Sequence, residues 1–277
     1  MYFQFVRNCG RLILWRFLWN VVRLLILARQ SNKKGTMEND FVFVHGLGDS
    51  PDVWMPLVDS LGNPNCLMVT LPGHGKPESF TDLASSLGNA AVQLRDANLD
   101  RPIFVGHSAG ALFALSLSFQ IEPAGLVLLD QGFRKDKSID VNYWLAQLDH
   151  SPARMVVEEI RNHVGSDRVS NARLLGNGLE HLTDETLKML WAQGADDPWP
   201  ILQLMLSSVV CPLLCVYAEK PTQEYEDWLK ASASACSHFE VAGFAVQPAH
   251  HWFFVDHPDE LASWIVSFFK NANPDSK

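Results

Sequence analysis

The sequence lacks the cysteine patterns of small extracellular domains and of structural metal sites. Its 277 residues include five cysteines, an odd number, and no two of them form a CxxC pair. These features argue against a disulfide scaffold and against a structural zinc site. A chain of this length can bury roughly three quarters of its unfolded surface. We therefore expect a fold that needs neither disulfides nor a metal ion for its stability.

Charge is also scarce, and its balance is negative. Charged residues make up 19% of the chain, hydrophobic residues 47%, and the formal net charge is -9. The hydrophobic content excludes a disordered chain, and the negative charge argues against nucleic acid as a partner. No internal repeat or low-complexity tract is present. The length then predicts one large domain, or one domain with an insertion.

Acidic residues are absent before Met37, whereas seven basic residues lie there. Between Leu12 and Ala28 this segment is apolar except at three positions, which a helix would place on one narrow stripe: Arg16, Asn20 and Arg23. Two arginines near the middle disfavour a simple membrane span. The lack of a small-x-small cleavage site disfavours a signal peptide.

Three interpretations of residues 1–36 remain open. The segment is an interfacial helix on a membrane, a targeting segment, or an extension without function in front of an alternative start at Met37. We expect a cytoplasmic protein, and the first interpretation adds peripheral membrane contact through residues 1–36.

From Phe41 onward, short apolar runs alternate with helical patterns. Continuously apolar runs indicate strands that are buried on both faces, as in a parallel sheet covered by helices. The alternation predicts an α/β layered fold. The expected strands are 41–44, 66–70, 102–105, 125–129, 212–217 and 238–241, and the expected helices between them are 54–61, 82–97, 109–119 and 261–269.

The gap between the expected strands ending at Leu129 and beginning at Pro212 is too long for a single crossover. It contains four helical stretches: 141–148, 153–164, 184–192 and 201–208. We interpret 131–210 as an inserted helical cap. The predicted domains are then the basic segment 1–36, a core formed by 37–130 and 211–277, and the cap.

The clearest chemical motif is Gly106-His-Ser-Ala-Gly110. It follows an apolar strand and opens a helix, which is the context in which G-x-S-x-G exposes a nucleophilic serine on a sharp turn. Ser108 is therefore the candidate nucleophile, and the amide of Ala109 points toward an oxygen bound there. A serine hydroxyl needs a base. We expect His251, just past the last strand, to supply it, with the adjacent His250 as the alternative.

Four motifs in this order resemble the α/β-hydrolase superfamily, in its branch with a helical cap. His45-Gly-Leu-Gly48 followed by Trp54 resembles the oxyanion segment, and Leu71-Pro-Gly-His-Gly75 resembles the loop after the next strand. Gly106–Gly110 resembles the nucleophile elbow, and His251 to Pro258 the terminal His-x6-Pro. The resemblance covers Phe41 to about Lys270.

The resemblance implies Ser108 as nucleophile, His251 as base, and the amides of Leu47 and Ala109 as the oxyanion hole. We expect no cofactor and no metal. It also implies that the first two strands of the family are missing. We therefore expect a mostly parallel sheet of six strands.

The sequence departs from the family pattern at the acid. The family usually carries its acid a few residues after the strand that corresponds to 212–217, where this chain has Pro221. Asp130 ends the preceding strand and keeps the order serine, acid, histidine, so it is the predicted acid. Glu219 is the main alternative, and Glu224 or no acid at all also remain.

The predicted function is a cofactor-free serine hydrolase. It would cleave an ester, thioester or similar acyl bond of an apolar small molecule through an acyl-enzyme. Two alternatives stay open: a ligand-binding, receptor-like member of the fold with low turnover, and a carbon–carbon bond hydrolase or cofactor-free haloperoxidase. The first rests on the missing acid after the penultimate strand.

Overall fold

The computed structural model describes residues 39–75, 82–131, 140–176, 178–191, 199–244 and 250–272. Residues 1–36 lie outside these ranges, so the interpretations of that segment, membrane contact included, stay predictions. No helix within the described ranges combines the length and the apolar character needed to cross a membrane.

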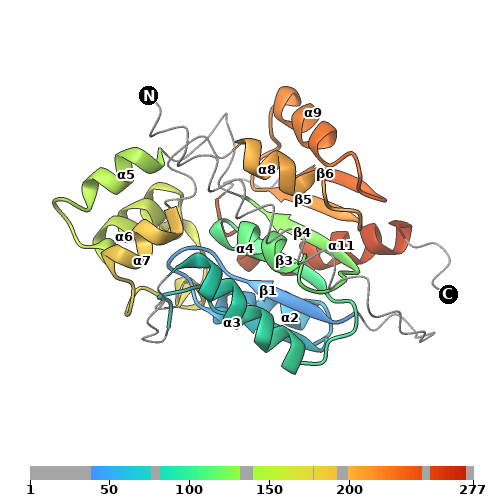
Figure 1. The fold of residues 1–277 in the computed structure, drawn as a ribbon, viewed down its shortest axis with the longest axis horizontal. Helices are drawn as coiled ribbons and strands as arrows, with labels where there is room; N and C mark the ends of the chain where they lie inside the picture. The colour runs from blue at the N-terminus through green and yellow to red at the C-terminus, as the bar shows by residue number, and fades with distance from the viewer. Residues whose placement is uncertain are drawn as a thin grey trace, which may run out of the picture.

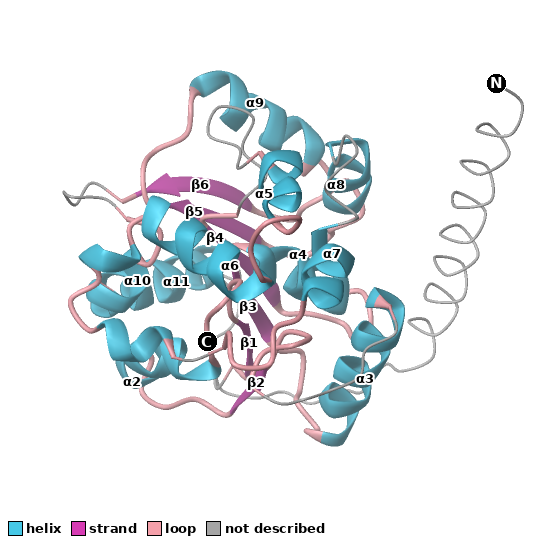
Figure 2. Ribbon diagram, turned by 90° about the vertical axis from the view of Figure 1, so that its left-hand side faces the viewer, coloured by secondary structure: helices cyan, strands magenta, loops and turns pink. Residues whose placement is uncertain are grey.

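The core is a six-stranded sheet in the order β2-β1-β3-β4-β5-β6, and every pair of neighbouring strands is parallel. This confirms the predicted fold class. Figure 2 shows the six strands stacked in this order. The strands are β1 (Phe41–Val44), β2 (Cys66–Val69), β3 (Ile103–His107), β4 (Gly125–Leu129), β5 (Leu213–Tyr217) and β6 (Phe239–Gly243).

Both faces of the sheet are covered, which explains why the strands are apolar throughout. Alternate residues point to opposite faces: Val105 and Leu129 pack on one side, Phe104 and Leu128 on the other. The first face is covered by α2 (Met55–Ser60), α10 (Phe253–Asp256) and α11 (Pro258–Ala272), the second by α3 (Leu83–Asp96), α4 (Ala109–Leu117), α8 (Trp199–Leu206) and α9 (Gln223–Ser232) (Figure 2).

Helix α9 is not among the expected helices. Its sequence, QEYEDWLKAS, is rich in charge, and its buried positions are few: Tyr225, Leu229 and Ser232. A sparse apolar stripe gives a weak periodic signal. The start of the helix is nevertheless marked, because the Thr222 side chain accepts a hydrogen bond from the Tyr225 amide.

Between β4 and β5 the chain forms a helical insertion, by which we mean α5 (Val141–Gln147), α6 (Ala153–His163), α7 (Asp184–Trp191) and the turns between them. Figure 1 shows these three helices grouped at one end of the molecule. They share a separate apolar cluster that includes Trp144, Val157 and Leu187. Helix α8 instead packs Leu202 and Leu206 into the core of the sheet. The predicted cap boundary at residue 210 stays a prediction.

Candidate active site

Ser108 occupies a sharp turn between β3 and α4. Its backbone has φ 53° and ψ -123°, a conformation that a residue with a side chain rarely adopts. The Ser108 amide donates to the Leu129 carbonyl at 2.9 Å, and its carbonyl accepts from the Ala111 amide at 3.0 Å. The chain thus holds one strained residue in place at the carboxyl end of a buried strand.

The glycines on either side of this turn are required by close packing. A Cβ atom on Gly106 would lie 2.5 Å from the Gly110 carbonyl oxygen, and one on Gly110 would overlap the carbonyl oxygens of Val44 and His45. Helix α4 can therefore approach β1 and β3 only because both positions lack a side chain.

The His251 ring contacts Asp130 at the end of β4. Its Nδ1–H donates to Asp130 Oδ2 at 2.6 Å, which leaves Nε2 as the other ring nitrogen. Asp130 Oδ1 accepts from the Ala218 amide at 3.2 Å, and the Asp130 amide donates to the Val216 carbonyl at 2.8 Å. Main-chain groups of β5 and the residue after it therefore hold the acid from two sides.

Asp130 is suited to remain ionised. Burial alone would raise the pKa of this carboxyl, but the hydrogen bond and charge of His251, the Ala218 amide and His107 together hold its pKa below the ordinary value. An ionised carboxylate at Nδ1 fixes the ring orientation and the tautomer of the histidine.

The other candidate residues lie in different surroundings. His250 binds Asp256, with Nε2 and Oδ2 2.9 Å apart. Glu219 and Glu224 are exposed, whereas the Asp130 side chain is 17% exposed. Of the three candidate acids, Asp130 is therefore the one that the structure places against His251.

The hydroxyl of Ser108 is not hydrogen-bonded to His251 in the part of the chain that the structure describes. The distance between a catalytic serine and its base is often long before a substrate is bound.

The amides expected at the oxyanion hole belong to Leu47 and Ala109, both partly buried. Within the described ranges, neither amide donates a hydrogen bond to another residue. The next amide in the loop is engaged, because Gly48 N–H donates to His74 Nε2 at 2.8 Å. Leu47 and Ala109 thus retain donors for a bound oxygen.

Two buried histidines fix the loops after β1 and β2. His45 Nδ1–H donates to the Gly46 carbonyl at 2.8 Å, and its Nε2 accepts from the Leu71 amide at 3.2 Å. His74 Nδ1–H donates to the Pro72 carbonyl at 2.8 Å. Burial lowers the pKa of His45 to about 3, with His74 contributing, and burial also lowers the pKa of His74. Both rings are therefore neutral, as their acceptor roles require.

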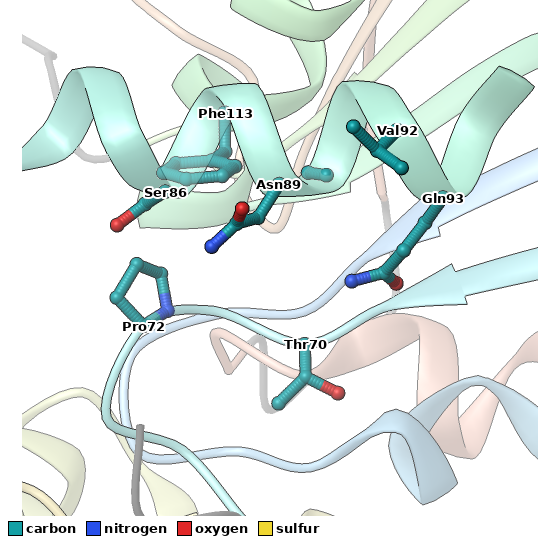
Figure 3. Close-up of a pocket in the computed structure, with 8 residues that line it drawn as sticks. Thr70, Pro72, Ser86, Asn89, Val92, Gln93 and Phe113 are labelled. Carbon is teal, nitrogen blue, oxygen red and sulfur yellow. The ribbon is translucent and has the colours of Figure 1, made fainter. Parts of the chain in front are cut away.

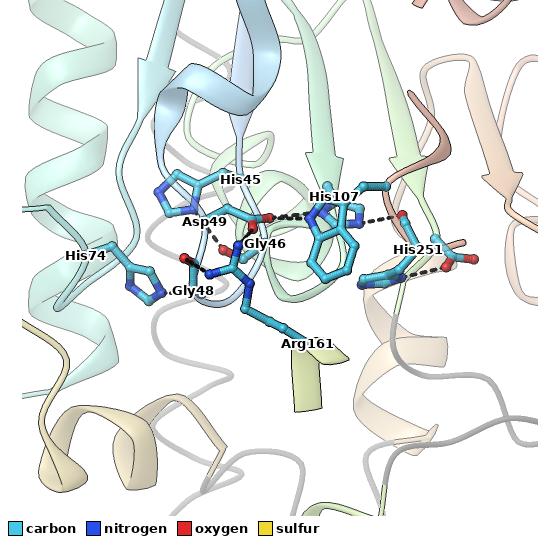
Figure 4. A network of polar contacts seen from close by, with 10 residues as sticks. His45, Gly46, Gly48, Asp49, His74, His107, Arg161 and His251 are labelled. Carbon is cyan, nitrogen blue, oxygen red and sulfur yellow. Dashed lines mark hydrogen bonds and ion pairs between the residues drawn. The ribbon is translucent and has the colours of Figure 1, made fainter. Parts of the chain in front are cut away.

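Sequence reasoning missed several polar residues that pack behind the site. Asp49 is fully buried and accepts from Trp252 Nε1 at 2.9 Å. His107 Nε2–H donates to the His251 carbonyl at 3.1 Å, and burial together with His251 lowers the pKa of His107. Arg161 extends from α6 to the loop after β1, where it binds the Gly48 carbonyl (Figure 4). Asp49 follows the His45–Gly48 motif and His107 lies within the Gly106–Gly110 motif, so both could have been singled out, but no pattern marks Arg161.

A surface pocket lies apart from these residues, between α3, α4 and the end of β2 (Figure 3). Its lining contains none of Ser108, Asp130 and His251 and consists of Thr70, Pro72, Ser86, Asn89, Ala90, Val92, Gln93 and Phe113. Within the part of the chain that the structure describes, no group of three or more histidine, cysteine or acidic side chains is arranged to hold a metal ion.

Similar solved structures share the fold. A lipase-esterase related protein from Clostridium acetobutylicum superposes with a TM-score of 0.62 at 18% identity, covering 86% of this chain and 96% of that one. MenH from S. aureus gives 0.63 at 15% identity over 88% and 97%. An esterase from Exiguobacterium antarcticum gives 0.63 at 13% identity over 84% and 92%.

A sequence relative covers less of the chain. A Haemophilus influenzae protein that carries the name of a 2-succinyl-6-hydroxy-2,4-cyclohexadiene-1-carboxylate synthase is 28% identical over 138 residues, 46% of this chain and 55% of that protein. The chain thus matches about half the length of this relative.

The family comparison covers most of the chain. The model of the alpha/beta hydrolase family matches residues 41–264, which include β1, the turn at Ser108, Asp130 and His251. Together with the parallel sheet and the strained serine turn, this match shows that the chain belongs to the alpha/beta hydrolase family.

Proposed function

We propose that the protein is a serine hydrolase that cleaves an ester, thioester or similar acyl bond. The observation that carries this proposal is the 2.6 Å hydrogen bond between His251 and Asp130. It gives the histidine beside the nucleophile elbow a carboxylate partner, as a general base requires. The strained backbone of Ser108 supports the same assignment.

In the proposed reaction, Ser108 Oγ attacks the carbonyl carbon while His251 Nε2 takes the hydroxyl proton. Asp130 orients the ring and stabilises the imidazolium that forms. The carbonyl oxygen becomes an oxyanion and accepts hydrogen bonds from the amides of Leu47 and Ala109.

The protonated histidine then gives its proton to the leaving group, and the acyl-enzyme forms. Water then attacks this ester while His251 takes its proton, and His251 returns that proton to Ser108 Oγ as the acid leaves. No cofactor enters any step. We propose an apolar acyl group, because Leu47 packs against the apolar cluster of the helical insertion.

We propose Asp130 as the acid, and its 2.6 Å contact with His251 supports this choice. The receptor-like alternative rested on the missing acid after β5, and an acid at Asp130 would remove that reason for it. A residue at the end of β4 can take this role because β4 and β5 are neighbours in the sheet.

Carbon–carbon bond cleavage is the second candidate. The Haemophilus influenzae relative carries the name of a synthase. A further structural neighbour, AqDC, with a TM-score of 0.65 at 13% identity, was described for ring-cleavage of the Pseudomonas quinolone signal. The same serine, histidine and acid could serve such chemistry, because the fold does not fix the substrate.

Labelling with a fluorophosphonate tests the proposal. The wild type and Ser207→Ala, a control at an exposed serine, should gain the mass of one phosphonyl group and hydrolyse short acyl esters. Ser108→Ala should take up no label and lose about a millionfold in kcat. Ester hydrolysis that survives in Ser108→Ala would contradict the assignment. A wild type that takes up label but cleaves no ester or thioester would favour the second candidate.

A further inference from the structure

Asp49 is a buried carboxylate that the proposed reaction does not use. Its side chain has no exposed surface. Oδ2 accepts from Trp252 Nε1 at 2.9 Å and lies 3.5 Å from His107 Nδ1, and Oδ1 lies 3.4 Å from Arg161 Nη2. In Figure 4 the Asp49 side chain lies next to Arg161 and points toward His107.

Two of these contacts lead to chain segments that carry a proposed catalytic group. Trp252 follows His251, and His107 precedes Ser108. Asp49 itself lies two residues after Leu47, and its amide donates to the Gly46 carbonyl at 3.3 Å. The carboxylate therefore joins the oxyanion loop, the nucleophile turn and the histidine loop.

Arg161 brings the helical insertion into the same cluster. Its Nη1 donates to the Gly48 carbonyl at 2.9 Å, and its Cζ atom lies 5.7 Å from the centroid of the Trp252 ring. The packing at this point is tight, since a Cβ atom on Gly48 would lie 2.9 Å from Arg161 Cδ and 3.0 Å from Val157 Cγ1. Loop 46–49 is thus held between the sheet and α6.

The opposite charges of Asp49 and Arg161 make these two residues depend on each other. A carboxylate without solvent contact is costly unless an opposite charge and hydrogen bonds compensate it. Burial raises the pKa of Asp49, but its neighbours His107, Arg161 and Trp252 outweigh burial and lower it. Burial and His251 lower the pKa of His107, whereas a guanidinium is always charged, so Arg161 is the lasting positive charge beside Asp49.

We propose that Asp49 and Arg161 are a positioning pair for the hydrolysis, through which the helical insertion sets the place of the Leu47 amide relative to Ser108 and His251. This inference rests on the proposed function for its catalytic consequence. Neither residue touches the reacting atoms. Their effect is to keep the oxyanion loop where the amide can meet the developing charge.

A set of four variants tests the pair against an ester that the wild type cleaves. Arg161→Met and Asp49→Asn should each lower kcat by about 10- to 100-fold, up to the usual loss of one oxyanion donor, with KM within about threefold. The double variant should lose less than the product of the two single losses, because it leaves no unpaired buried charge. Arg161→Lys should restore part of the loss. Arg154→Met, an exposed arginine on the same helix, is the control and should leave kcat unchanged.

Amide hydrogen exchange supplies a readout that does not depend on activity. In Arg161→Met, exchange of the amides in loop 46–49 should rise about tenfold or more, while the amides of β4 keep their protection. If the wild type cleaves no substrate, the proposed function fails and this readout still decides the pairing. Multiplicative losses in the double variant, unchanged exchange in the loop, or a uniform rise that includes β4 would each overturn the proposal.

Discussion

Two neighbouring histidines each bind an aspartate, yet the two pairs are built differently. His251 uses Nδ1 to bind Asp130 at 2.6 Å, whereas His250 uses Nε2 to bind Asp256 at 2.9 Å. The first aspartate ends a central strand of the sheet. The second belongs to the short helix α10 and also accepts hydrogen bonds from the amide and hydroxyl of Ser170.

The difference shows that a His–Asp contact does not by itself mark a base. In the His251 pair, Nε2 is left for a proton from Ser108. In the His250 pair, the remaining nitrogen, Nδ1, is buried and has no hydrogen-bond partner within the described ranges. Through Ser170 this second pair ties the helical insertion to α10. We therefore interpret His250–Asp256 as structural and His251–Asp130 as functional.

Exchange of each histidine for glutamine tests this interpretation most severely. His251→Gln should lose about a millionfold in kcat, because the nucleophile and its base act as a unit. His250→Gln should retain kcat within about threefold. Both are measured by steady-state hydrolysis of the same ester, with circular dichroism to verify the fold. A loss above a hundredfold in folded His250→Gln would reverse the assignment.

The two aspartates should separate activity from stability. Asp130→Asn should lower kcat by up to about ten-thousandfold through the wrong tautomer of His251. Asp256→Asn should leave kcat nearly unchanged and lower the melting temperature by a few degrees, the cost of about 1 kcal/mol of hydrogen bonding. Glu219→Gln and Glu224→Gln are the matched controls and should be silent. A damaging effect of Glu219→Gln would move the acid to the loop after β5.

A further prediction concerns stability at mildly acidic pH. Burial lowers the pKa values of His45, His74, His107 and His250 in the folded state. The unfolded chain therefore binds more protons as the pH falls below about 6.5, and the free energy of unfolding decreases. The urea midpoint should be highest above pH 7 and fall toward pH 5, with a shallower slope in His250→Gln. A midpoint that is flat from pH 8 to 5 would show that these rings are not held neutral.

The sheet and the strained turn at Ser108 could be predicted because their signals are local. Strands buried on both faces are apolar throughout, and the turn at Ser108 needs its glycines at fixed spacing. The acid could only be ranked, with Asp130 before Glu219, because the choice depends on the distance from each carboxylate to His251 in the folded sheet. Arg161 was missed for a similar reason, since it meets Gly48 across 113 positions of the chain.

The manner in which Asp130 is held has a consequence for heat inactivation. Its amide and its carboxylate are both bound by main-chain groups of Val216 and Ala218. The part of the site that contains Asp130 should therefore unfold together with the sheet. The oxyanion half depends on contacts with helix α6, which lies outside the sheet. On warming, turnover should thus be lost at a lower temperature than the β-structure. Between these two temperatures the loss should be reversible, so that cooling restores turnover.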